Sequence, residues 1–378
     1  MEKIKAAVIG LGFIGRQHVE AIRRVPGIEV VAASDADPKN REWCRKNDIP
    51  LFYEDYRKLI CEAGAEVIHD CTPNYLHYQV NGLALEQGCH VYSEKPLTLC
   101  SEEAFRLADM ADAADRKAGV NFQYRNHVCI HEIRERIRNG ELGRLSHIQA
   151  EYLQDWLLYE DDYDWRMESA AGGISRAVGD IGSHCFDAIQ FVTAQKIKAV
   201  YARYYTMYPV RKMYGRSETF STEDKTGKYE EKKIDTEDAA TILFRLEDGM
   251  EGTLVVSQVC AGKKNGMKIL ISGNKESVEW AQEEPDKLHV GKRDTGNEMI
   301  YAARKYFTEY GGKMAILPNG HPVGWTDALA VSVKEFYDSI RNPDADYRYA
   351  DFRQGAYVSK IVEACFKSSR QNCWIDVG

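Results

Sequence analysis

The sequence contains no apolar run that reaches the roughly 18 residues needed for a membrane-spanning helix. It has no block of like charge longer than a few residues, and its 50 basic and 58 acidic side chains leave a net charge of −8. Binding to nucleic acid needs a basic surface, so this balance argues against such a partner. Hydrophobic residues make up 44% of the 378 residues, enough for a soluble protein with two buried cores.

The ten cysteines form no CxxC pair and show no regular spacing. This pattern indicates that the cysteines are small buried hydrophobic residues in a reducing cytoplasm rather than disulfide partners. The opening segment, MEKIKAAVIGLGFIG, places lysines before apolar residues, as signal peptides do. Its glycines recur every two or three residues, however, and no small-residue cleavage site follows. We therefore expect a first β-strand here and a cytoplasmic protein.

Short apolar runs alternate with helical patterns over the first third of the chain. Strands are predicted at 4–10, 28–35, 65–71, 89–94 and 119–124, and helices at 14–24, 38–47, 55–64, 75–88 and 101–117. Such βαβ alternation predicts an α/β domain, in which a doubly wound parallel sheet carries helices on both faces.

The pattern changes near residue 140. Strands are predicted at 144–156, 196–206, 238–246, 250–258, 267–272 and 275–281, and helices in the 180s and at 297–309, 325–341 and 351–369. LEDGME (246–251) and SGNKES (272–277) are typical of hairpins, whereas the polar segment 211–235 predicts a long loop or insertion. We expect two domains, 1–125 and 126–378, the second being antiparallel α+β with a last helix free to pack back on the first.

A glycine motif, Gly10-x-Gly12-x-x-Gly15, directly follows the first predicted strand and opens a helix. Asp35 ends the second strand twenty positions later. Glycines let the backbone approach a pyrophosphate, the helix N-terminus attracts its charge, and the carboxylate accepts from ribose hydroxyls. The sequence therefore predicts a dinucleotide site that includes Phe13, Ile14 and Ser34.

The charge of Asp35 would repel a phosphate on the ribose, which favours NAD over NADP. Lys39 and Arg41 lie close in sequence and keep NADP as the less favoured alternative.

Two further loops follow parallel strands at the same predicted sheet edge. CTPNYLHYQV (71–80) contributes Thr72, Pro73, Asn74 and His77, and SEKPLT (93–98) contributes Glu94 and Lys95. A lysine directly before a proline, at the end of a strand where α/β sheets bind ligands, is a cation with restricted position. For an isolated EKP, a solvated lysine would be the better interpretation, but the order of these neighbouring loops favours a binding site.

GDIGSHCFD (179–187) places Asp180 and His184 four residues apart, on one face if the segment is helical. A metal site is disfavoured, because no third ligand has a convincing spacing. A structural alternative remains open, in which Asp180 caps a helix and His184 is a core imidazole. In the catalytic interpretation, His184 is a proton acceptor beside the carboxylate of Asp180. Such a pair suits removal of a proton from an alcohol.

Together, these motifs resemble the Gfo/Idh/MocA oxidoreductase family, which includes glucose–fructose oxidoreductase and inositol dehydrogenase. The matching segments are Gly10-x-Gly12-x-x-Gly15, Thr72-Pro73-Asn74…His77, Glu94-Lys95-Pro96 and Gly172-Gly173…Asp180-x-Gly-x-His184. YLQDWLL, DWR and NGHPVGWTDAL look most like the branch that contains levoglucosan and glycoside 3-dehydrogenases. The resemblance runs in order over nearly the whole chain.

The resemblance implies a Rossmann domain followed by a domain with a large open antiparallel sheet, and NAD(P)-dependent oxidation of a sugar, glycoside or polyol. It implies that Lys95, Asp180 and His184 are catalytic and that the Lys95–Pro96 bond is cis. His184 would accept the hydroxyl proton while Lys95 stabilises the developing charge on the oxygen. Lys95 and His184 would then meet at one substrate oxygen.

The resemblance also implies substrate-binding positions at Arg125, Gln154, Trp165, Arg166, His184 and His321. Asn126-His127 departs from the commoner Asn-Pro, and core packing for Trp165 and a surface turn for His321 are equally compatible with the sequence. An open sheet face indicates a homodimer or homotetramer. Two rival functions remain: an NAD-recycling glycosidase, which oxidises its sugar transiently, and a non-catalytic NAD and sugar sensor.

Overall fold

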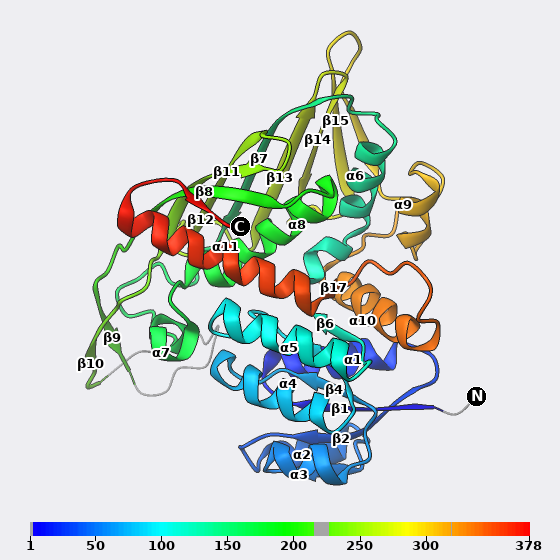
Figure 1. Ribbon diagram of the computed structural model, residues 1–378, viewed down its shortest axis with the longest axis vertical. Helices are drawn as coiled ribbons and strands as arrows, with labels where there is room; N and C mark the ends of the chain where they lie inside the picture. The colour runs from blue at the N-terminus through cyan, green and yellow to red at the C-terminus, as the bar shows by residue number, and fades with distance from the viewer. Residues whose placement is uncertain (1–2, 215–226, 319) are drawn as a thin grey trace. The chain divides into compact units, whose positions relative to one another are not determined.

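The computed structural model describes residues 3–214, 227–318 and 320–378, and the chain forms two compact units (Figure 1). Unit 1 contains Met1–Asn126 and Trp325–Ser359, and unit 2 contains His127–Gly324 and Lys360–Gly378. From the sequence we predicted a domain boundary after residue 125, with all later residues in the second domain. Residues 325–359 instead belong to unit 1, so the chain passes between the units three times rather than once.

Unit 1 is built on a seven-stranded sheet in the order β17-β6-β5-β4-β1-β2-β3. Its strands are β1 (Ile4–Ile9), β2 (Ile28–Ser34), β3 (Leu51–Tyr53), β4 (Val67–Asp70), β5 (His90–Ser93), β6 (Ala118–Val120) and β17 (Ala350–Asp351). Every pairing is parallel except that of β17 with β6. The strand order reverses between β1 and β4, the switch point at which such sheets bind ligands.

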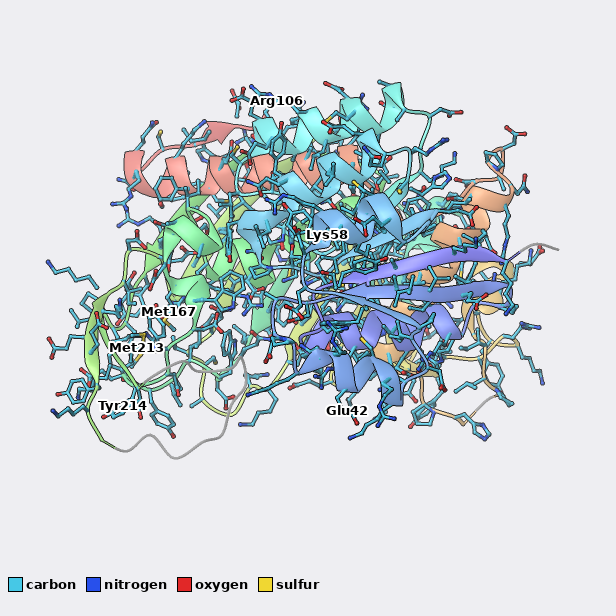
Figure 2. All side chains as sticks on the ribbon, turned by 90° about the horizontal axis from the view of Figure 1, so that it is seen from below. Glu42, Lys58, Arg106, Met167, Met213 and Tyr214 are labelled. Carbon is cyan, nitrogen blue, oxygen red and sulfur yellow. The ribbon has the colours of Figure 1, made fainter. Side chains whose placement is uncertain are left out.

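The helices of unit 1 follow the predicted pattern closely. They are α1 (Phe13–Arg23), α2 (Asn40–Lys46), α3 (Tyr56–Glu62), η1 (Asn74–Leu76), α4 (His77–Glu86), α5 (Ser101–Ala113), η2 (Gln123–Asn126) and α10 (Trp325–Arg341). Charged side chains on these helices, such as Glu42, Lys58 and Arg106, are exposed (Figure 2). The opposite faces are apolar and pack on the sheet, as expected of amphipathic helices in an α/β layer.

Helix α10 joins unit 1 because its apolar face completes the core of that unit. Leu329, Val333 and Phe336 pack in one cluster with residues of β1 and α1. The sequence showed that this helix has a buried face, but not which core buries it.

Unit 2 contains a nine-stranded sheet in the order β16-β15-β14-β13-β7-β12-β11-β8-β18. The strands are β7 (Leu145–Leu153), β8 (Ile197–Tyr205), β11 (Ala239–Leu246), β12 (Glu251–Ser257), β13 (Gly266–Gly273), β14 (Glu276–Ala281), β15 (Lys287–Lys292), β16 (Glu298–Tyr301) and β18 (Ile375–Asp376). Only β7 and β12 pair in parallel, and both predicted hairpins are present. The predicted fold, a parallel α/β domain plus a large antiparallel sheet, is confirmed.

One face of the unit 2 sheet is covered and the other carries exposed side chains. Along β11, Ile242 and Phe244 are buried while Leu243 is exposed, which is the alternation of a sheet with one covered face. The helices of this unit are α6 (Val128–Arg138), η3 (Trp165–Met167), α7 (Ser169–Gly172), η4 (Val178–Gly182), α8 (Ser183–Thr193), α9 (Glu309–Met314) and the later part of α11 (Phe352–Gln371).

The helix predicted at 297–309 was wrong. Residues 298–301 form the edge strand β16, in which Tyr301 pairs with Lys287 of β15, and α9 begins only after Thr308. Thr308 accepts a hydrogen bond from the Gly311 N–H and so caps α9 at that point. The segment 211–235 is also not wholly a loop, because β9 (Val210–Met213) pairs with β10 (Glu230–Lys233). Residues 215–226 of it lie outside the described residues.

Crossing a bilayer requires a long and nearly uncharged apolar helix, and none in the described part of the chain meets both requirements.

Candidate active site

The glycine motif forms a tight turn between β1 and α1, and two of its glycines are required by close backbone contacts. Gly10 has a φ of +88°, and a Cβ there would lie 2.4 Å from the carbonyl oxygen of Cys71. A Cβ on Gly15 would lie 1.8 Å from the carbonyl oxygen of Gly10. The first and last glycines therefore allow the strand, the turn and the helix to approach one another.

Gly12 has a different role from its neighbours. It is the N-terminal cap of the eleven-residue helix α1, and no atom lies within 4 Å of a Cβ placed on it. Helix α1 has no acidic residue in its first turn, so no carboxylate of that turn competes for its N–H groups and its positive dipole end. Beside them, Phe13 is 64% exposed. This geometry suits the close approach of a pyrophosphate.

Asp35 is held next to this turn by backbone hydrogen bonds. Its Oδ2 accepts from the Leu11 N–H at 2.7 Å, and its Oδ1 accepts from the Asp37 N–H at 2.8 Å. The carboxylate is therefore fixed at the end of β2, where the remaining lone pairs can accept from ribose hydroxyls. Ser34 is buried, and its carbonyl accepts from the Gly10 N–H at 2.8 Å, so it supports the turn through its backbone.

His77 connects the two loops that the sequence placed at one sheet edge. Its Nε2 lies 2.8 Å from the carbonyl oxygen of Thr72, and its Nδ1 lies 2.7 Å from that of Pro96. Carbonyl oxygens only accept, so the ring makes both hydrogen bonds when both of its nitrogens carry hydrogen. The imidazole is buried between the loops. The two bonds tie the loop of Thr72 to the loop of Lys95, and contact of His77 with a cofactor stays a prediction.

Lys95 follows β5, and the Lys95–Pro96 peptide bond is cis, as the resemblance implied. Glu94 beside it is buried and fully engaged. Its Oε1 accepts from Asn121 Nδ2 at 2.6 Å and lies 3.0 Å from His18 Nε2, and its Oε2 accepts from the Lys95 N–H at 3.2 Å. Burial by itself raises the pKa of Glu94, but the hydrogen bond and charge of His18 and the charge of Lys95 bring it down to about 2. Glu94 is thus a fixed anion that orders the Lys95 backbone.

Two other predicted contacts of unit 1, Thr72 and Arg125, bond to side chains of the same unit. Asp70 Oδ1 accepts from the Thr72 N–H and from the Thr72 hydroxyl, which shapes the loop that continues through Pro73 and Asn74. Arg125, predicted to contact substrate, is buried and donates to Gln354 Oε1 at 2.9 Å. Arg125 thereby links η2 to the first turn of α11.

In unit 2, the segment 179–187 is helical, as predicted. Asp180 lies inside η4, a π-helical turn, and His184 follows in α8. Since η4 is capped at Ala177 and the side chain of Asp180 bonds elsewhere, the alternative in which Asp180 caps a helix is wrong. His184 is only 4% exposed and lies near the ring of Tyr152. π-Helical turns occur often at functional sites.

The sequence analysis did not identify Gln258, whose side chain bonds to Asp180. Gln258 donates from Nε2 to Asp180 Oδ2 at 2.9 Å, from a buried position directly after β12. The only sequence feature that marks Gln258 is its position as a glutamine within the apolar run VVSQVC. This feature does not indicate that its partner is Asp180, 78 residues away.

The glycine pair before η4 is explained by a close backbone contact. A Cβ on Gly172 would lie 2.4 Å from the carbonyl oxygen of Arg166, and Gly173 has a φ of +102°. Arg166 stacks on the ring of Trp165 and bonds to Asp164 at 3.1 Å. The loop that contains the predicted substrate contacts Trp165 and Arg166 is therefore tightly folded on itself.

Gln154 is buried at the end of β7, within a small polar cluster. Its Oε1 accepts from Trp156 Nε1 at 3.0 Å, and its Nε2 donates to Asn265 Oδ1 at 3.2 Å. His321, the last predicted substrate contact, is exposed and bonds back to the carbonyl of Pro318 at 3.1 Å. His321 is therefore exposed and bonded locally, and its contact with a substrate stays a prediction.

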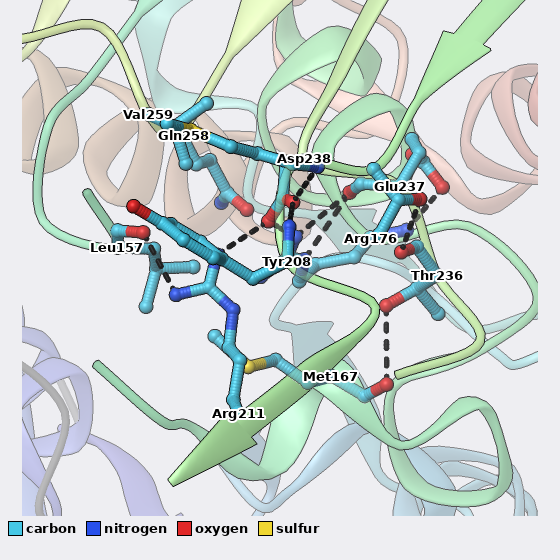
Figure 3. A network of polar contacts seen from close by, with 12 residues as sticks. Leu157, Met167, Arg176, Tyr208, Arg211, Thr236, Glu237, Asp238, Gln258 and Val259 are labelled. Atoms are coloured by element: carbon cyan, nitrogen blue, oxygen red, sulfur yellow. Dashed lines mark hydrogen bonds and ion pairs between the residues drawn. The ribbon is translucent and has the colours of Figure 1, made fainter. Parts of the chain in front are cut away.

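A buried ionic network fixes the chain just before η4 (Figure 3). The carboxylate of Asp238 binds both Arg176 and Arg211, the latter at 2.7 Å, and all three side chains are buried. Burial raises the pKa of Asp238, but the two guanidinium charges outweigh burial and lower it. Glu237 accepts from the Val178 N–H at 2.9 Å, and burial raises the pKa of Glu237.

Among residues 3–214, 227–318 and 320–378, no group of three or more histidine, cysteine, aspartate or glutamate side chains is placed to hold a metal ion.

Two family models match the chain. The oxidoreductase family with an NAD-binding Rossmann fold matches residues 4–122, and the GFO/IDH/MocA C-terminal domain matches residues 130–279. The chain is 25% identical to levoglucosan dehydrogenase of Pseudarthrobacter phenanthrenivorans over 395 aligned residues, covering 100% of this chain and 99% of that protein. It is also 25% identical to glucose-6-phosphate 3-dehydrogenase of Bacillus subtilis over 365 residues, covering 96% and 95%.

The solved structures with similar folds include an inositol dehydrogenase homologue of Azotobacter vinelandii complexed with NAD+. It is 26% identical, with a TM-score of 0.86, and the match covers 99% of this chain and 97% of that one.

Proposed function

The chain belongs to the GFO/IDH/MocA family of NAD-binding oxidoreductases that act on sugars and cyclitols, and we propose that it oxidises a secondary hydroxyl, at C3, of a pyranose or glycoside. Similarity to levoglucosan dehydrogenase and to a 3-dehydrogenase of glucose 6-phosphate supports the choice of a pyranose ring and of C3. Similarity to an inositol dehydrogenase homologue makes a cyclitol the next substrate class to test.

One observation carries the mechanism: a buried imidazole, His184, follows a carboxylate that is fixed one turn earlier, Asp180. In our proposal His184 accepts the proton of the substrate hydroxyl, and Asp180 stabilises the imidazolium that results. Lys95, whose backbone is ordered by Glu94, donates a hydrogen bond to the reacting oxygen and stabilises its negative charge. The nicotinamide supplies the acceptor for the hydride that leaves the same carbon.

We propose NAD rather than NADP as the cofactor. The carboxylate of Asp35 is fixed by the Leu11 N–H where a ribose would bind, and its charge would repel a 2′-phosphate. Of the two cations that kept NADP open, Arg41 bonds to Glu54 at 3.0 Å and both Arg41 and Lys39 are exposed.

We further propose that unit 1 binds the cofactor and that unit 2 binds substrate and forms a homodimer or homotetramer. Leu243 and Val255 are exposed on neighbouring strands of unit 2, as apolar side chains at an interface would be. Sedimentation analysis tests this assembly. Six of the ten cysteines are buried as core residues, which supports the proposal of a reducing, cytoplasmic location.

The function is tested with purified protein, NAD, and a panel of glycosides, free pyranoses and inositols. NADH absorbance measures the oxidation, and analysis of the product locates the ketone. Release of an aglycone without net NADH would instead identify an NAD-recycling glycosidase.

Variants then test the two catalytic assignments. Lys95→Ala and His184→Ala should each lower kcat at least about a hundredfold, the scale of a lost acid–base group. Lys58→Ala on α3 and His289→Ala on β15 change exposed residues of the same types and should leave kcat unchanged. Rates near those of the wild type in either catalytic variant would refute its assignment.

A further inference from the structure

Gln258 is fixed in place by its backbone as well as by its side chain. Its N–H donates to the carbonyl oxygen of Asp238 at 3.0 Å, and its own carbonyl accepts from the Leu157 N–H at 3.2 Å. The residue has no exposed surface. A buried amide held in this way has little freedom to move away from Asp180.

We propose that Gln258 is a positioning residue that keeps Asp180 ionised and oriented for its work with His184, an inference that rests on the proposed function. The Nε2 group can only donate, so its 2.9 Å hydrogen bond to Asp180 Oδ2 stabilises the carboxylate more than the protonated acid. Asp180 itself is partly exposed, whereas Gln258 bonds to it from a fully buried position.

The orientation of the Gln258 amide determines which group donates and which accepts in this hydrogen bond. Gln258 Oε1 is buried and meets no hydrogen-bond donor among the residues that the structure describes. If the amide turned over, Oε1 would face the Asp180 carboxylate, and two acceptors would oppose each other unless Asp180 carried a proton. The observed orientation is therefore the one that matches an ionised Asp180.

The two ends of the hydrogen bond are anchored to two adjacent residues, Asp238 and Glu237. The carbonyl of Asp238 holds the Gln258 N–H, and the carboxylate of Asp238 is itself clamped by two arginines (Figure 3). Glu237 holds the Val178 N–H at the start of η4, two residues before Asp180. The distance between Gln258 and Asp180 is thus set by one rigid segment.

The proposal predicts a particular change in the proton transfer step. When the substrate hydroxyl gives its proton to His184 and its hydride to the nicotinamide, a positive imidazolium forms. An ionised Asp180 stabilises that charge, whereas a protonated Asp180 does not. Without Gln258, the pKa of Asp180 should rise and the acid limb of the activity profile should move to higher pH.

The test compares Gln258→Leu and Gln258→Glu with the wild type. Gln258→Leu removes the donor, and kcat should fall at least about tenfold while the KM for NAD stays unchanged. In Gln258→Glu the two carboxyl groups should share a proton, which should move the acid limb of kcat/KM up by about one pH unit or more. A merely structural role would lower activity equally at every pH.

The chain offers a matched control. Gln195 Nε2 donates to Asp248 Oδ2 at 3.0 Å, the same bond between the same residue types in an exposed contact just before β8. Gln195→Leu should leave kcat and the pH profile unchanged. If Gln258→Leu does not fold, as judged by circular dichroism, the near-isosteric Gln258→Glu decides the question.

The inference is overturned if the folded Gln258 variants keep the wild-type kcat and acid limb while Lys95→Ala and His184→Ala are slow. If the wild type oxidises no member of the sugar panel, the proposed function fails instead, and the two failures are therefore distinguishable.

Discussion

The backbone N–H of Leu11 donates to Asp35 Oδ2 at 2.7 Å, across 24 residues of chain. This hydrogen bond joins the middle of the glycine turn to the residue after β2. The turn that would bind the pyrophosphate and the carboxylate that would bind the ribose are therefore one rigid unit rather than two separate contacts. Changes at Asp35 should consequently affect cofactor binding through both charge and geometry.

Asp35→Asn separates these two effects. The amide oxygen can still accept from Leu11, but the negative charge is lost. We expect kcat/KM for NAD to fall about tenfold, or ~1.4 kcal/mol, and the preference for NAD over NADP to shrink by at least as much. Steady-state kinetics with both cofactors measure this. Asp37→Asn, at an exposed neighbouring carboxylate, serves as the control, and an unchanged cofactor preference in Asp35→Asn would contradict the assignment.

Gly12 and Gly15 should respond in opposite ways to alanine. A Cβ on Gly15 collides with the Gly10 carbonyl at 1.8 Å, so Gly15→Ala should lower the Tm by several degrees. Gly12 has a φ of −64° and open space around it, so Gly12→Ala should keep the wild-type Tm. The added methyl group would instead obstruct the phosphates and weaken NADH binding at least about tenfold.

Calorimetry and NADH fluorescence titration together test this pair. Equal losses of Tm in the two variants, or unimpaired NADH binding by Gly12→Ala, would show that the turn does not bind the cofactor in the way we describe.

His90 should make the folded state sensitive to acid. Its Nδ1 accepts from the Lys117 N–H at 2.9 Å, which requires a neutral ring, and burial together with the charge of Arg116 lowers its pKa to about 4. In the unfolded chain the pKa is about 6.5, so the unfolded state takes up the proton first as the pH falls. The stabilisation is complete above pH 6.5 and is lost as the pH falls towards 4.

His90→Asn keeps an acceptor for Lys117 but cannot titrate. We expect the fall in Tm between pH 7.5 and pH 5 to be smaller in this variant than in the wild type. His289→Asn, at an exposed position of β15, should show the wild-type dependence. An identical dependence in wild type and His90→Asn would assign the acid sensitivity to other groups.

Local motifs explain why so much of unit 1 could be predicted from the sequence. The spacing of Gly10, Gly15 and Asp35 is typical of one βαβ unit, whose strands and helix lie close together in the sequence. The helix at Asp180 was likewise predictable, because the i, i+4 pattern is a property of the segment itself.

The parts that could not be predicted depend on distant partners. The bond from Gln258 to Asp180 spans 78 residues, and the tie from His77 to Pro96 depends on how two loops converge. The segment 298–301 becomes a strand because β15 offers it an edge, although its own composition suits either structure. The placement of α10 depends in the same way on the core that it completes.

The buried triad of Asp238, Arg176 and Arg211 provides a last test, because its one carboxylate binds two guanidinium groups. Asp238→Asn preserves the size of the side chain but removes the carboxylate that both buried cations bind. We expect a loss of about 3–5 kcal/mol in the stability of unit 2, seen by calorimetry as a lower Tm. Glu251→Gln removes the exposed ion pair with Arg245 and should cost at most about 1 kcal/mol. If Asp238→Asn cost no more than that control, the network would not be what holds the segment before η4, and the rigid support that we assign to Asp180 would have to come from elsewhere.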